Sequence, residues 1–65
     1  MNMRLKMHPV VEEMNEVLRS DPDAVVSEEL DRLEKTYELD REESAYLFQK
    51  FADKMSPREF AGRVR

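Results

Sequence analysis

Apolar residues in this chain recur every three or four positions, in segments that are separated by prolines and by residues that commonly begin helices. This spacing places the apolar side chains of one segment on a single face of an α-helix. The chain has only one glycine, and the β-branched cluster at residues 24–26 is too short for a strand. The sequence therefore predicts an all-α fold, in the form of a small helical bundle.

The first predicted helix covers about residues 9–19. Pro9 suits its first position, because the N–H that proline lacks would have no partner there. Residues 1–8 precede this start, and we expect them to form a mobile N-terminal segment ahead of a single helical domain over residues 9–65. The apolar stripe of this helix consists of Val10, Val11, Met14, Val17 and Leu18.

The second predicted helix covers about residues 22–39. A residue before proline disfavours helical backbone angles, so we expect Asp21 to be extended and to cap a helix that has Pro22 at its first position. Ser27, which two glutamates follow, is also a suitable start. The sequence leaves open whether the helix is continuous through it. The apolar stripe consists of Val26, Leu30, Leu33 and Tyr37.

The third predicted helix covers about residues 41–55. Asp40 and Glu43 have the spacing of a capping box, in which each side chain accepts a hydrogen bond from the backbone N–H of the other residue. Because aromatic side chains bury large areas, we expect this helix to be the hydrophobic centre of the fold. Its broad apolar stripe consists of Ala45, Leu47, Phe48, Phe51, Ala52 and Met55.

A short fourth helix is predicted over residues 57–64. Ser56 and Glu59 form a capping box ahead of it, with a proline at the first helical position. A helix of about eight residues is marginal in water by itself, so we expect packing to order it as a lid on the core. Gly62 costs about 1 kcal/mol relative to alanine, which indicates either close approach to another helix or fraying. The apolar face consists of Phe60, Ala61 and Val64.

The core that these helices offer is small. Apolar residues make up 40% of the 65 residues, and in chains of this size burial only roughly balances the entropy lost on folding. Small helical proteins can resolve this by dimerising. The apolar stripes of the first and third helices are broad for one small monomer, so a homodimer is a further hypothesis.

Several kinds of chemistry lack the residues that they require. The chain has no cysteine, which excludes a disulfide framework and a thiolate zinc site. Its single histidine, His8, has no second imidazole with which to bind a metal. We therefore expect no enzymatic activity, no cofactor and no metal site. No apolar run is long enough to span a bilayer, so we expect a cytoplasmic protein without a membrane partner.

Charge is unevenly distributed along the chain, whose net charge is −4. Residues 9–43 hold thirteen acidic and four basic residues, whereas residues 44–65 hold five basic and two acidic ones. The acidic part would attract basic surfaces and repel nucleic acid. The simpler interpretation is that these acids occupy the solvated faces of the helices.

The leading hypothesis is a small acidic protein–protein interaction module. It would act as a regulator, adaptor or inhibitor without a catalytic site, and would bind a basic or apolar surface of another protein. Salt should weaken such binding, because exposed charges are screened over about 8–10 Å at ordinary ionic strength. The candidate partner-binding face consists of Glu12, Glu13, Glu16, Glu28, Asp31, Glu34 and Glu38.

The alternative hypothesis is a nucleic-acid-binding domain. Residues 41–65 follow the order helix, tight turn, helix, and helix-turn-helix proteins place the second helix in the major groove while basic side chains contact phosphates. The brevity of the second helix and the acidity of the preceding segment count against this hypothesis. The candidate contacts gather in residues 50–65 and are Lys50, Lys54, Arg58, Arg63 and Arg65.

Overall fold

The computed structural model describes residues 2–63, apart from the side chains of Phe60 and Arg63. Over this range it contains four α-helices, one turn of 3₁₀ helix and no strand. The predicted all-α bundle of three longer helices and a short fourth is therefore confirmed. The elements are α1 (Met3–Ser20), α2 (Val26–Thr36), α3 (Arg41–Phe51), the 3₁₀ turn η1 (Ala52–Lys54) and α4 (Pro57–Arg63).

α1 begins at Met3 rather than at Pro9, so most of segment 1–8 belongs to the helix instead of preceding it. The Asn2 side chain caps this earlier start. Proline inside the helix removes one backbone hydrogen bond, at a cost of about 3 kcal/mol. The predicted start was wrong because the residues before the proline contribute to the core through Met7, which is 1% exposed.

α2 begins at Val26 rather than at Pro22, because a turn follows α1. The Asp21 side chain accepts a hydrogen bond of 3.0 Å from the Asp23 N–H, a common use of aspartate in turns. The predicted helix cap at this position is therefore wrong. The helix starts one residue before Ser27, so it does not run continuously from the proline.

α2 ends at Thr36 rather than at Leu39. Glu38 follows with a φ angle of 51°, in the left-handed region. The Leu39 N–H then donates a hydrogen bond of 2.9 Å back to the Glu34 carbonyl. This arrangement is a Schellman motif, which usually has glycine at the left-handed position. Because that position holds glutamate here, the end of the helix was not recognisable from the sequence.

α3 starts at Arg41, as predicted, behind a complete capping box. The Asp40 side chain accepts a hydrogen bond of 2.8 Å from the Glu43 N–H, and the Glu43 side chain accepts one of 2.9 Å from the Asp40 N–H. The backbone changes to the 3₁₀ turn η1 after Phe51, so the α-helix does not continue to Met55.

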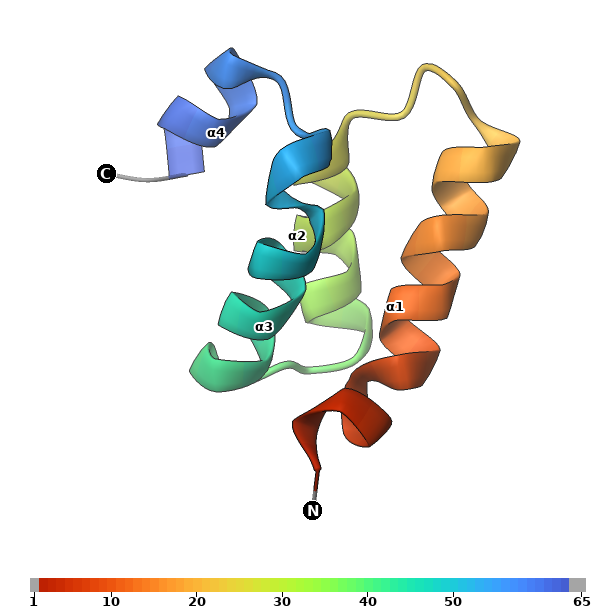
Figure 1. The fold of residues 1–65 in the computed structure, drawn as a ribbon, viewed down its shortest axis with the longest axis vertical. Helices are drawn as coiled ribbons and strands as arrows, with labels where there is room; N and C mark the ends of the chain where they lie inside the picture. Colours follow the sequence, from red (N-terminus) through yellow and green to blue (C-terminus); the bar gives the residue numbers. More distant parts are fainter. Residues whose placement is uncertain (1, 64–65) are drawn as a thin grey trace.

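α1, α2 and α3 pack against one another, and α4 contacts α2 (Figure 1). α4 lies beside the N-terminal end of α2. The predicted lid on the core depends on Phe60 and Val64, whose side chains lie outside the described part of the chain, so it stays a prediction. A β-carbon at Gly62 would meet no described atom within 4 Å, so close approach to another of the described helices does not explain this glycine. The buried core consists of Met7, Val10, Met14, Val26, Leu30, Leu33, Leu47, Phe51 and Met55.

Most of the apolar residues that we predicted to be buried are at least partly buried. The exceptions are Tyr37, Ala45 and Ala61, which are exposed. Tyr37 is exposed because α2 ends just before it. The side chain of Phe60 and the whole of Val64 lie outside the described part of the chain.

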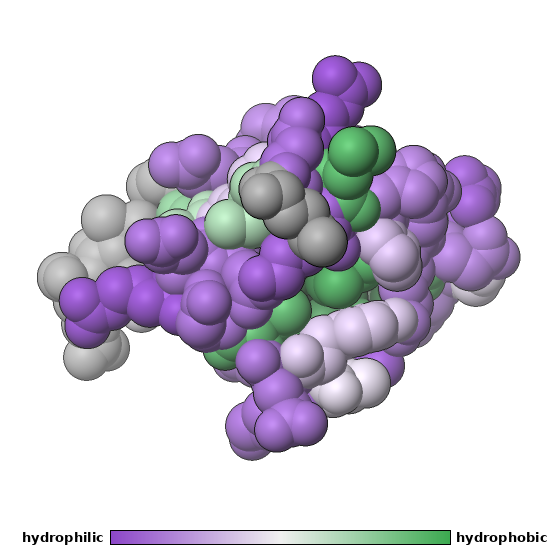
Figure 2. All heavy atoms as spheres, turned by 90° about the horizontal axis from the view of Figure 1, so that it is seen from below, coloured by the Kyte–Doolittle hydropathy of each residue, from purple (hydrophilic) through white to green (hydrophobic). Residues whose placement is uncertain are grey.

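The broad stripes of α1 and α3 pack largely within one chain, which removes much of the reason to expect a homodimer. Among the described residues, the exposed large apolar side chains are Leu5, Val25 and Tyr37. Figure 2 shows the end of the bundle that carries the N terminus, where hydrophilic side chains cover most of the surface and apolar ones appear between them. A homodimer stays a prediction.

Candidate functional site

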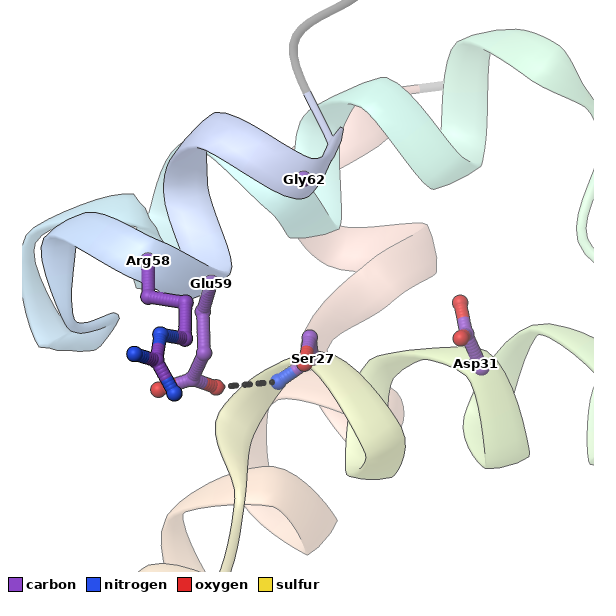
Figure 3. A pocket seen from close by; sticks show the side chains of 5 residues that line it. All are labelled: Ser27, Asp31, Arg58, Glu59 and Gly62. Carbon is purple, nitrogen blue, oxygen red and sulfur yellow. Dashed lines mark hydrogen bonds between the residues drawn. The ribbon is translucent and has the colours of Figure 1, made fainter.

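Glu59 joins α4 to the start of α2. The N-cap residue of α2 is Val25, which has no side-chain acceptor for the free N–H groups of the first turn. Glu59 supplies this acceptor from α4, because its Oε1 accepts a hydrogen bond of 3.0 Å from the Ser27 N–H (Figure 3). Its Oε2 accepts one of 3.1 Å from the Ser56 N–H, and the Ser56 Oγ accepts one of 3.3 Å from the Glu59 N–H. One carboxylate therefore completes the predicted capping box of α4 and also caps α2.

These hydrogen bonds favour the ionised form of Glu59. The backbone N–H of Ser27, followed by that of Ser56, lowers the pKa of this carboxyl below its ordinary value. The carboxylate also lies at the N-terminal end of α2, where the helix dipole favours negative charge. The contact between α4 and α2 thus depends on a charged side chain.

The groove between α2 and α4 has a volume of about 490 Å³. Among the described residues, Asp31 and Glu59 contribute carboxylates to its lining and Arg58 contributes a guanidinium. Among its lining residues, no imidazole lies beside the Ser27 hydroxyl to activate it as a nucleophile. The lining consists of Ser27 and Asp31 from α2, and of Arg58, Glu59 and Gly62 from α4 (Figure 3).

A second polar link joins α1 to α3 through Glu43, a residue that is only 7% exposed. Its Oε2 lies 2.5 Å from the Lys6 Nζ. The hydrogen bond from Lys6, followed by that from the Asp40 N–H, lowers the pKa of Glu43. Together with the burial of Met7, this pair explains why α1 extends before its proline.

A third polar link joins α1 to α2. The Tyr37 hydroxyl donates a hydrogen bond of 2.5 Å to Glu13 Oε1, and the Arg32 Nη1 lies 3.5 Å from Glu13 Oε2. The bond to Glu13, followed by burial, raises the pKa of Tyr37. The Arg32 Nε also donates a bond of 2.9 Å to Glu29. Glu13, which we predicted to contact a partner, therefore makes its contacts with Tyr37 and Arg32 within the bundle.

A smaller groove, of about 230 Å³, lies between α1 and α3. The Lys50 Nζ lies 5.8 Å from the centre of the Tyr46 ring, within the range of a cation–π contact. The His8 Nε2 lies 3.8 Å from Glu12 Oε1. The lining consists of Arg4, His8, Val11, Glu12, Tyr46 and Lys50.

The contribution of α1 to this groove was not predicted from the sequence. The first helix was expected to begin at the proline, so Arg4 and His8 fell in a segment that was expected to be mobile. Their four-residue spacing places them on one helix face. A helix continued through the proline would have revealed this pairing.

The seven acids that we predicted to contact a partner do not form a single patch. Glu12 lines the groove between α1 and α3, whereas Asp31 lines the groove between α2 and α4. Glu16 is exposed near the end of α1 and pairs with Arg19 at 2.5 Å. Apart from Glu13, the remaining members lie on α2 or just after it, and are Glu28, Glu34 and Glu38.

The basic residues of the alternative hypothesis are also dispersed. Lys50 lines the groove between α1 and α3, Arg58 lines the groove between α2 and α4, and Lys54 lies in η1. The side chain of Arg63 and the whole of Arg65 lie outside the described part of the chain. The described bases are therefore divided among α3, η1 and α4, and Lys50 and Arg58 line different grooves.

Within residues 2–63, no group of three or more histidine, cysteine, aspartate or glutamate side chains is arranged to hold a metal ion. None of the helices that the structure describes is long and apolar enough to cross a membrane. The fold is that of a small all-α bundle, and in the described part of the chain Glu13, Glu43 and Glu59 each link two helices. No protein-family model matches the chain, and neither a curated protein nor a solved structure shows significant similarity to it.

Proposed function

We propose that the protein is a small acidic interaction module that binds another protein, as a regulator, adaptor or inhibitor, and that it catalyses no reaction. The main support is the use of its polar side chains. Glu13, Glu43 and Glu59 each connect two helices, so the polar groups that come together in these links serve the fold. The function then belongs to the surface, where other acids are exposed.

The surface that best fits a partner lies where α1 passes into α2. Glu16 lies near the end of α1 and Glu28 lies in the first turn of α2, and Figure 1 places these two helix ends at the same end of the bundle. Both acids are exposed, and the segment between them carries two further exposed acids. Val25 in this segment is 40% exposed and adds an apolar contact. A partner surface with basic and apolar groups side by side would complement it.

Charge reversal tests this proposal. The wild type, immobilised on a resin and incubated with a lysate of the source organism, is expected to retain a specific protein. The variant Glu16→Lys/Glu28→Lys is expected not to retain that protein. Raising the salt to about 0.5 M should also release the partner, because screening weakens exposed charge pairs. A partner that both conditions leave bound would contradict the proposal.

A matched control reverses two exposed acids elsewhere on the surface. Glu42→Lys/Asp53→Lys makes the same change in net charge on α3 and η1. It should keep the partner, whereas equal loss in both double variants would show a response to net charge alone.

The alternative proposal, a nucleic-acid-binding domain that uses residues 50–65, keeps two points of support. α4 follows α3 after a short connection, and Lys50, Lys54 and Arg58 are exposed. We place it second because Lys50 and Arg58 line different grooves and the acidic surface repels phosphates. It predicts a shift of a short DNA duplex at about 0.1 M salt, abolished in Arg58→Glu.

A further inference from the structure

The groove between α1 and α3 brings together basic side chains that are far apart in the sequence. Arg4 and His8 lie one turn apart on α1, and Lys50 comes from α3. Tyr46, one turn before Lys50, contributes its ring to the same groove. The extension of α1 before its proline is what makes this arrangement, because it supplies two of the three bases.

Two of these bases are not neutralised within the described part of the chain. Lys6, Arg19 and Arg32 all form ion pairs with glutamates. Arg4 and Lys50, in contrast, form no ion pair with any residue in 2–63. An arginine and a lysine that face one groove without carboxylate partners form a local positive site on an acidic protein.

The chemistry of this lining suits a phosphate group. A guanidinium offers paired N–H donors to two phosphate oxygens, and an ammonium adds a point charge. The His8 imidazole and the Tyr46 hydroxyl can donate further hydrogen bonds. Among the described residues of the lining, Glu12 is the one carboxylate, and it lies beside His8, with 3.8 Å between the nearest atoms.

We propose that this groove binds a single phosphate group carried on the side chain of a peptide. The net charge of −4 and the exposed acids repel a long polyanion, which favours an isolated phosphate over a nucleic acid. Val11 and the Tyr46 ring supply apolar surface for the side chain that carries the phosphate. The site is distinct from the proposed acidic surface, so each can fail without the other.

A titration followed by two-dimensional NMR tests the proposal with three probes: a blocked phosphoserine pentapeptide, its unphosphorylated form and inorganic phosphate. The phosphopeptide is expected to shift the amide signals of residues 4–12 and 46–50 in a saturable manner below about 10 mM. The unphosphorylated peptide should leave them in place, and inorganic phosphate should bind at least about fivefold more weakly.

Variants locate the binding. Arg4→Gln and Lys50→Gln should each weaken phosphopeptide binding about tenfold, which corresponds to the loss of one charge-assisted hydrogen bond. Lys54→Gln removes an equal charge from an exposed lysine outside the groove and should change the affinity less than about twofold. Lys50→Arg keeps the charge and should restore most of the binding, which separates loss of the site from loss of the fold.

Four results would overturn the proposal. These are unmoved signals in the presence of the phosphopeptide, equal weakening by Lys54→Gln and Lys50→Gln, inorganic phosphate that binds as tightly as the phosphopeptide, and a DNA duplex that competes for the same residues at lower concentration. Equally tight binding of inorganic phosphate would mean that the groove is a site for the free anion. Competition by the DNA duplex would mean that the groove binds nucleic acid.

Discussion

Glu59 accepts hydrogen bonds from backbone N–H groups at the starts of two helices. Val25, at the N-cap of α2, has no side-chain acceptor, so removal of α4 would leave the Ser27 N–H to water. A carboxylate suits this position because both of its oxygens accept, whereas an amide has one accepting oxygen and a nitrogen that only donates. The negative charge is a second requirement, since it complements the helix dipoles.

Glu59→Gln should therefore destabilise the protein although it keeps the size of the side chain. One of the two N–H groups loses its acceptor, and we expect the melting temperature to fall by about 5 °C, the scale of a lost cap in a domain of this size. Thermal unfolding by circular dichroism at pH 7 measures it. Glu28→Gln is the control, because Glu28 is exposed in the first turn of the same helix and should change the melting temperature by only about 1–2 °C. Equal falls in melting temperature for the two substitutions would show that Glu59 stabilises the protein only through its charge near the helix dipole, and not through its two hydrogen bonds.

Glu38 occupies a backbone conformation that favours glycine. Its φ angle of 51° is left-handed, which costs roughly 1 kcal/mol for a residue with a β-carbon. Glu38→Gly should raise the free energy of unfolding by about 0.5–1 kcal/mol. Urea denaturation measures this gain. Lys35→Gly, inside α2, should have the opposite sign and cost about 1 kcal/mol. A loss of stability in both variants would rule out strain at Glu38.

At the scale of the helices, the sequence predicted their number, their order and most of their buried positions, because apolar spacing reports on the face that packs. The helix ends were harder to predict because the local signals are ambiguous. Proline can begin a helix, yet Pro9 is accepted inside α1, where tertiary contacts offset its cost. Asp21 can cap a helix but here begins a turn. Because the helix was expected to begin at Pro9, the groove between α1 and α3 was not predicted either, since two of its basic residues precede the proline.

The N-terminal turns of α1 should be essential to stability. Met7→Ala removes a side chain that is 1% exposed, and such truncations cost about 2–5 kcal/mol. Because a domain of this size has only about 3–5 kcal/mol in total, the variant should be largely unfolded near room temperature in a circular dichroism melt. Leu5→Ala makes a similar truncation on the same helix where the side chain is 71% exposed, and should cost less than about 0.5 kcal/mol. Near-normal melting of Met7→Ala would show that the first turns do not pack as described.

At the scale of the whole molecule, the homodimer hypothesis depends on the apolar surface that remains exposed. Light scattering at about 10 µM should give twice the chain mass of 7.8 kDa if this hypothesis is right. Leu5→Lys places a charge on the most exposed large apolar side chain of the described residues and should then restore the monomer. A wild type with the mass of one chain would end the hypothesis.

The polar links between helices depend on pH: acid weakens those that Glu43 and Glu59 make, and base weakens the one that Tyr37 makes. The hydrogen bond from Lys6 lowers the pKa of Glu43, and the Ser27 N–H lowers the pKa of Glu59. Their stabilisation is therefore complete above the ordinary pKa of about 4.5 and is lost as the pH falls below it. The hydrogen bond to Glu13 raises the pKa of Tyr37, so its stabilisation is complete below about pH 10 and is lost at higher pH.

We therefore expect the urea midpoint of the wild type to be nearly constant between about pH 6 and 9 and to fall on both sides. Glu59→Gln should have a lower midpoint at neutral pH, and its curve should approach that of the wild type as the pH falls below the ordinary pKa of about 4.5 and Glu59 itself becomes protonated, because the carboxyl then loses its advantage over the amide. The urea midpoint of Tyr37→Phe should approach that of the wild type only at alkaline pH, where Tyr37 loses its proton and with it the hydrogen bond to Glu13. If the midpoint curves of a variant and of the wild type were parallel at every pH, the substituted group would have the same pKa in the folded and unfolded chains. The links would then owe their strength to packing rather than to charge.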